Sequence, residues 1–240
     1  MMPMSLTLFS ILCLGFFLGM RHASDPDHVI AVSTIVSRQR SIGAAALTGI
    51  CWGAGHGLTM LIVGGAIVLF GFVVPERLGL SLELGVALML IVLGVLNVSG
   101  TVRQARETLA AGGHGHGHAT SPGLLETRFG GLCLCQAVRA MAIGVVHGLA
   151  GSAAVTLLVL PIIHDPLSSM AYLATFGVGT IAGMMLITAL VGLPFLYTQA
   201  HRHPLHRWMG ATTGMLSASF GVFLVYQIGF VDGLFTSINK

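Results

Sequence analysis

Residues 9–37 read FSILCLGFFLGMRHASDPDHVIAVSTIVS, and this stretch decides the fold. An apolar run ends at Met20, ionisable side chains crowd the next eight residues, and a second apolar run begins at Val29. An uncharged run of about 18 residues or more can cross a bilayer as a helix. Pro26 removes a backbone donor and disfavours helical geometry at the preceding residue. We therefore predict a membrane helix that is broken between the two apolar runs.

The composition of the whole chain is that of an integral membrane protein. Of its 240 residues, 55% are hydrophobic and 8% are charged, whereas a soluble domain carries about 25% charged residues. The mean hydropathy is +0.90. So few charges cannot cover a water-soluble surface, which excludes a soluble enzyme, a nucleic-acid-binding module and a disordered chain.

Further apolar runs predict the remaining membrane spans. With the broken first segment they make six crossings, although residues 4–37 could cross once or twice. Most of the arginines fall in the loops that six crossings place on one side, and only Arg77 and Lys240 fall on the other. The excess of arginine places those loops in the cytoplasm and both termini outside. The further runs are residues 41–75, 84–102, 140–163, 167–200 and 208–231, and the arginine-rich loops are residues 37–42, 103–139 and 201–207.

The six spans divide into two halves, residues 1–102 and 140–240, joined by a histidine-containing cytoplasmic linker, residues 103–139. Glycines match between the halves at nearly constant separation. Three spans in each half insert the second copy upside down, as in many secondary transporters, which bind substrate where the repeats meet. We expect an all-α six-helix bundle with a 3+3 inverted repeat. The matched glycines are Gly19 with Gly144, Gly65 with Gly192, and Gly94 with Gly221.

The polar segment between the first two apolar runs predicts a metal site. Each charged residue at the bilayer centre costs about 2.5–3.5 kcal/mol, so the segment must face protein or a wet cavity. A helix break at Pro26 can turn His22, Asp27 and His28 toward one point, and imidazole suits Zn, Cu, Fe and Ni. The alternative is a structural network, in which Arg21 pairs with an acid and the histidines bond to the backbone.

The spacing His-x4-Asp-His, from His22 to Asp27 and His28, resembles the signature of the nickel/cobalt transporter (NiCoT) family. That signature reads roughly Arg-His-Ala-x-Asp-Ala-Asp-His, so Pro26 replaces its usual Ala. Residues 55–59 partly resemble the second family motif, and residues 146–153 resemble the short, urease-associated UreH-like branch. The resemblance implies that Ni²⁺ or Co²⁺ crosses a bacterial inner membrane.

Further histidines are candidates for the same chemistry. Asp25 is a nearby acid, and His56 and His147 lie inside long apolar spans, where ionisable groups are rare. We expect these two histidines to be transit ligands or outer partners of the site; the alternative is a hydrogen bond across helices. Short histidine-rich tracts bind metal, so an auxiliary capture site is expected in the linker, with an ordinary flexible linker as the alternative. That tract consists of His114, His116 and His118.

These observations predict a secondary transporter of Ni²⁺ or Co²⁺ that works in the uptake direction. An efflux permease and a membrane metal-binding accessory protein without transport are the alternatives. The chain has no nucleotide-binding glycine loop followed by Lys and Ser or Thr, so neither an enzyme nor an ATPase subunit is expected. The expected partners are the cation, the bilayer and cytoplasmic nickel-handling proteins. We expect no prosthetic group and no nucleic acid.

Overall fold

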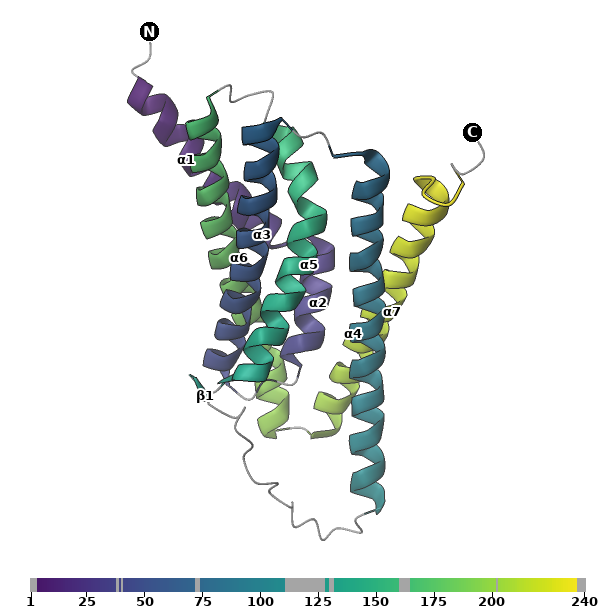
Figure 1. The fold of residues 1–240 in the computed structure, drawn as a ribbon. Helices are drawn as coiled ribbons and strands as arrows, with labels where there is room; N and C mark the ends of the chain where they lie inside the picture. Colours follow the sequence, from purple (N-terminus) through teal and green to yellow (C-terminus); the bar gives the residue numbers. More distant parts are fainter. Residues whose placement is uncertain are drawn as a thin grey trace.

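The computed structural model describes residues 4–37, 39, 41–71, 74–110, 128–129, 132–159, 165–201 and 203–236, and most of these residues are α-helical (Figure 1). The expected all-α membrane bundle is confirmed. The small exception is a pair of two-residue antiparallel strands just before the fifth helix. The elements are α1 (Met4–His22), α2 (Pro26–Val36), α3 (Ile42–Phe70), α4 (Glu76–Ala110), β1 (Arg128–Phe129), β2 (Leu132–Cys133), α5 (Leu134–Val159), α6 (Pro166–His201), α7 (His203–Tyr226) and the π-helix η1 (Gln227–Val231).

Five helices in the described part of the chain, α3 to α7, are long and apolar enough to cross a membrane. Their outward surfaces carry exposed large apolar side chains such as Leu58, Leu190 and Phe223. In water such a surface would be costly, whereas lipid tails accept it. The chain is therefore a multi-pass membrane protein. The sixth crossing, made by two shorter helices, stays a prediction.

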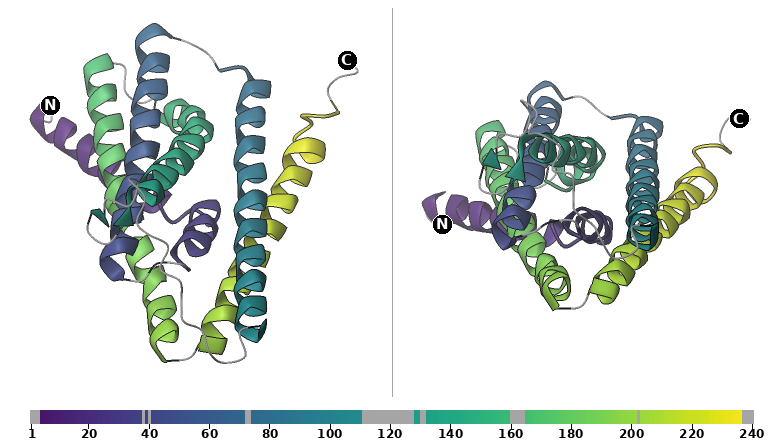
Figure 2. Two further views of the ribbon diagram at one scale, coloured as in Figure 1. Left: turned by 60° about the horizontal axis from the view of Figure 1, so that its bottom comes forward. Right: turned by 90° about the horizontal axis from the view of Figure 1, so that it is seen from below.

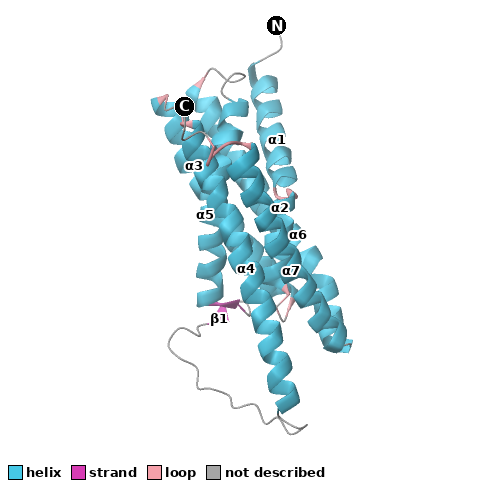
Figure 3. Ribbon diagram, turned by 90° about the vertical axis from the view of Figure 1, so that its right-hand side faces the viewer, coloured by secondary structure: helices cyan, strands magenta, loops and turns pink. Residues whose placement is uncertain are grey.

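The first segment is broken where the sequence predicts. Helix α1 ends at His22, and α2 begins at Pro26 after Asp25, whose backbone is extended. A turn joins them, in which the Ser24 and Asp25 amides donate to the carbonyls of Arg21 and His22. Pro at the first position of a helix is favourable because its missing N–H would be unpaired there anyway. Figure 3 shows α1 and α2 following one another along the bundle; that residues 4–37 together make one crossing stays a prediction.

The helices form two groups with α2 between them. Helix α3 packs against α5 and α6, and α1 packs along α6, while α4 pairs with α7 at the side of the molecule (Figure 2). Helix α2 touches members of both groups. Three of the largest fully buried side chains, Trp52, Leu90 and Met184, belong to an apolar core that reaches across both groups, and Met60 belongs to a second cluster.

Reciprocal glycine contacts relate the two halves. Gly19 in α1 lies against the α6 backbone at Phe176, and Gly144 in α5 lies against the α3 backbone at Trp52. A Cβ atom at either glycine would collide with the facing carbonyl oxygen, so only glycine allows these helices to approach so closely. Helices α1 and α2 run along the bundle in the opposite direction to α5 (Figure 1). Superposing the first half of the chain on the second would therefore turn the first half upside down.

The second matched pair of glycines also makes reciprocal contacts. Gly94 in α4 lies against the α7 backbone, and Gly221 in α7 lies against the α4 backbone. The third match fails this comparison, because Gly65 and Gly192 contact only side chains. Two of the three matches thus have the reciprocal contacts that an inverted repeat requires.

The connections at the two ends of the bundle agree with the arginine distribution. Helices α2, α4 and α6 end, and α3, α5 and α7 begin, at one end of the bundle, whereas α1 begins and η1 ends at the other (Figure 1). In the sequence, the arginine-rich segments join these helix ends; that this end is cytoplasmic stays a prediction. Helix α4 continues past the predicted span to Ala110, and α5 begins earlier than expected, at Leu134. The histidine tract, His114, His116 and His118, lies outside the described residues.

Candidate metal site

Side chains from four helices meet at the break in the first segment. His22 is the last residue of α1, Asp27 and His28 lie in the first turn of α2, His56 lies in α3, and His147 lies in α5. On one continuous helix, His22 and His28 would point about 240° apart. The break instead brings their rings together, with centroids 4.9 Å apart.

Three imidazoles form the centre of the cluster. His22, His28 and His56 each offer a ring nitrogen, and these nitrogens all lie within 4.8 Å of one another. The Nε2 atoms of His22 and His56 are 3.2 Å apart, a distance at which one ring donates a hydrogen bond to the other when no ion is bound. Two nitrogens bound to one ion at about 2.0–2.1 Å are about 2.9–3.4 Å apart when the angle between the bonds is 90° to tetrahedral. The spacing of this pair therefore fits a shared transition-metal ion.

Several ring nitrogens of the cluster lack a hydrogen-bond partner among the described residues. They are His28 Nε2, His56 Nδ1 and His147 Nε2, and all three are buried. Leaving a buried polar atom unsatisfied costs about 1–3 kcal/mol. In native proteins, buried polar atoms without a protein partner often have a functional role, such as binding an ion. His56 is fully buried and His28 is 2% exposed, so an ion held here would be largely withdrawn from bulk water.

The two acids contact the imidazoles from outside the cluster. Asp25 Oδ2 lies 2.7 Å from His22 Nδ1, and Asp27 Oδ1 lies 3.0 Å from His28 Nδ1. A neutral imidazole that donates from Nδ1 to a carboxylate presents the Nε2 lone pair on its other side, and the carboxylate makes that nitrogen more basic. The structure thus places an oxygen of Asp27, which the sequence predicts as a metal ligand, against the His28 ring; which of the two would bind a metal ion stays a prediction. Arg21 is exposed, and both acids contact histidines.

His147 lies at the edge of the cluster. Its ring centroid is 4.9 Å from that of His28, its Nδ1 lies 3.3 Å from the Ile143 carbonyl oxygen, and its Nε2 lies 3.8 Å from Asp27 Oδ2. The sequence assigned the same transit or outer role to His56 and His147. The structure separates them, because His56 joins the central three imidazoles and His147 does not.

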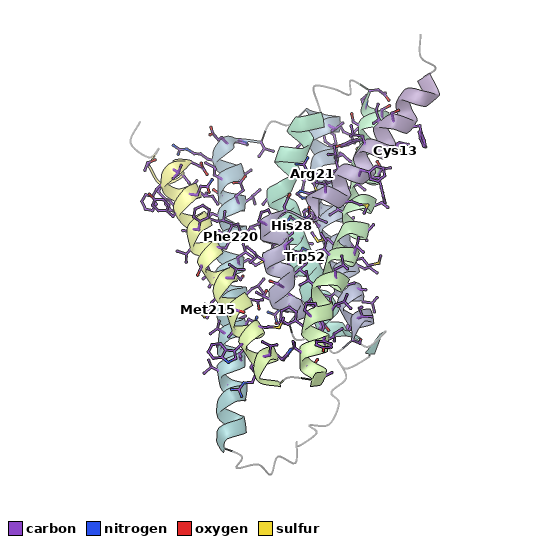
Figure 4. All side chains as sticks on the ribbon, turned by 180° about the vertical axis from the view of Figure 1, so that it is seen from behind. Cys13, Arg21, His28, Trp52, Met215 and Phe220 are labelled. Carbon is purple, nitrogen blue, oxygen red and sulfur yellow. The ribbon has the colours of Figure 1, made fainter. Side chains whose placement is uncertain are left out.

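A tryptophan that the sequence analysis did not single out forms one wall of the site. Trp52 is fully buried, and its ring stacks on His28 with centroids 5.9 Å apart and an interplanar angle of 15°. Figure 4 shows both residues near the middle of the bundle. Trp52 precedes His56 by one helical turn, and residues four apart share a helix face. The four-residue spacing between Trp52 and His56 could therefore have predicted that Trp52 lies at the site.

The fold and the site define a class: a multi-pass helical membrane protein with a buried cluster of histidines at a break in its first segment. The chain is 37% identical over 231 residues to the urease accessory protein UreH of Bacillus sp. (strain TB-90), across 95% of this chain and 96% of that protein. The chain therefore belongs to the UreH family. No family model and no solved structure matches it.

Proposed function

We propose that this protein is a secondary transporter of the nickel/cobalt transporter type, which carries Ni²⁺ or Co²⁺ inward across the bacterial inner membrane. One observation carries the proposal: His22, His28 and His56 converge inside the bundle with their ring nitrogens close together. Ionisable groups at membrane depth are costly and mark substrate and ion pathways. Imidazole favours nickel and its neighbours over Mg²⁺ and Ca²⁺.

The carboxylates support the same chemistry. Asp25 and Asp27 each contact the Nδ1 atom of a histidine, which supports Nε2 as the metal-binding atom. Only an unprotonated imidazole nitrogen binds a metal ion, so ions and protons compete for the site. This competition offers a way to release the ion, whatever the coupling ion is.

The uptake direction rests on the relative. Its name describes a urease accessory protein, and uptake would supply a nickel enzyme in the cell. An efflux permease would use the same site, and so would an accessory protein that binds metal without transport. Comparing intracellular nickel and cobalt in cells with and without the gene fixes the direction. Uptake predicts that cells carrying the gene contain more metal.

Transport and simple binding are separated by purified protein in liposomes loaded with a dye that nickel quenches. A transporter quenches the dye faster than protein-free liposomes do when Ni²⁺ is added outside. An accessory protein that only binds metal leaves the quenching rate at the protein-free level. That second result would contradict the proposed function.

A further inference from the structure

A cavity of about 300 Å³ connects the histidine cluster with two acids that the proposed site does not include. It lies between α2, α4, α5 and the α7–η1 segment. His28 and His147 line it, and so do Glu83 of α4 and Asp232, which caps η1. Phe220 on α7 also lines the cavity, and Figure 4 labels it together with His28 on α2.

The positions of the lining residues give the cavity a direction. Glu83 lies about two turns from the start of α4, and Asp232 directly follows η1. The start of α4 and the end of η1 both lie at the end of the bundle where α1 begins (Figure 1). The histidines lie deeper, where α2 begins. The cavity therefore extends from near this end toward the metal site.

The chemistry of the two ends of the cavity is complementary. Glu83 is an acid inside a membrane span, which is costly unless it faces water or protein, and both acids are exposed. A low-dielectric cleft lined by charges of one sign concentrates ions of the other sign. At the deep end, the buried Nε2 atoms of His28 and His147 have no hydrogen-bond partner among the described residues. The lining also includes η1, and π-helices are frequent at functional sites.

We propose that this cavity is the mouth of the metal path, and that Glu83, assisted by Asp232, draws a hydrated divalent cation into it before the histidines bind the ion. The proposal rests on the proposed function. The carboxylates near the mouth of the cavity attract Mg²⁺ as well as Ni²⁺. The imidazoles at its deep end retain only the transition metal. Glu83 thus raises the local concentration of cations, and the histidines select among them.

Two substitutions in the same helix test the proposal. Glu83→Gln removes the charge at nearly constant size, and Glu76→Gln removes an exposed charge at the start of α4 that does not line the cavity. The assay is the initial rate of radioactive nickel uptake by intact cells that lack other nickel transporters, with transporter amounts matched by immunoblot. We expect Glu83→Gln to raise the KM for Ni²⁺ about three- to tenfold and to keep the maximal rate. Glu76→Gln should match the wild type.

Excess Mg²⁺ provides a second readout. In the wild type it should raise the KM for Ni²⁺, because it competes at the carboxylates, and this rise should be smaller in Glu83→Gln. Glu83→Asp should restore most of the wild-type KM. If Glu83→Gln and the wild type had equal KM values for Ni²⁺, the inference would be overturned and the proposed function would stand. The same holds if Glu83→Gln and Glu76→Gln raised the KM equally. A loss of maximal rate at unchanged KM would also overturn it. A wild type that takes up no nickel would overturn both proposals.

Discussion

At the scale of the residue, the account depends on which nitrogen of each histidine faces the cluster. The Nδ1 atoms of His22 and His28 contact carboxylates, which leaves Nε2 of each for the ion. The sequence predicted that these two histidines act together, because a helix break between them brings them to one side. It could not rank His56 above His147, since both are histidines followed by glycine in apolar spans. Only the packing of α3 and α5 against the break separates their roles.

This ranking predicts different effects for two alanine variants. His56→Ala removes one of the three central imidazoles, so nickel transport should fall at least about tenfold. His147→Ala leaves those three in place and should retain most of the activity. Uptake of radioactive nickel by cells with matched protein amounts measures both. If His147→Ala were the more damaging variant, the assignment of the three central imidazoles would be wrong.

At the scale of the element, the spans follow the hydropathy closely and the helix ends do not. The broken first segment and the five long helices lie where apolar runs and Pro26 place them. Helix α4 continues beyond its predicted span because Arg103, Arg106 and Glu107 end the apolar run, and charged residues can end a membrane span without ending a helix. The sequence shows the glycines at the close helix contacts, but it could not predict which helix each glycine faces.

These contacts can be tested with one added methyl group. Gly144→Ala places a Cβ against the Trp52 carbonyl oxygen, on the helix that carries His56. Overpacking of this kind costs about 1–3 kcal/mol, so the melting temperature in detergent should fall and nickel transport should fall with it. Gly85→Ala is the matched control, because a Cβ there meets nothing within 4 Å. Alanine also favours a helix over glycine, so the control should melt at the same temperature or higher. Equal melting temperatures for the two variants would count against close packing at Gly144.

At the scale of the whole molecule, the candidate site lies where α2 meets α1, α3 and α5. The cavity at the histidines lies on one side of α2, and a second cavity of about 200 Å³, lined in part by Thr34, Gln39 and Asn97, lies near its other end. Gln39 and Asn97 are buried polar residues with hydrogen bonds to other helices. The composition and the arginine distribution predicted a helical membrane bundle with its arginine-rich loops on one side of the membrane. They could not predict these cavities, which depend on how α4 and α5 pack beside α2.

The central claim is that His22, His28 and His56 bind the transported ion through ring nitrogens. X-ray absorption spectroscopy of the purified protein loaded with one equivalent of Ni²⁺ measures this directly. The account predicts three imidazole nitrogens at about 2.0–2.1 Å from the metal, and two such nitrogens in the His28→Ala variant. A first shell made only of oxygen atoms, or a shell that His28→Ala leaves unchanged, would contradict it.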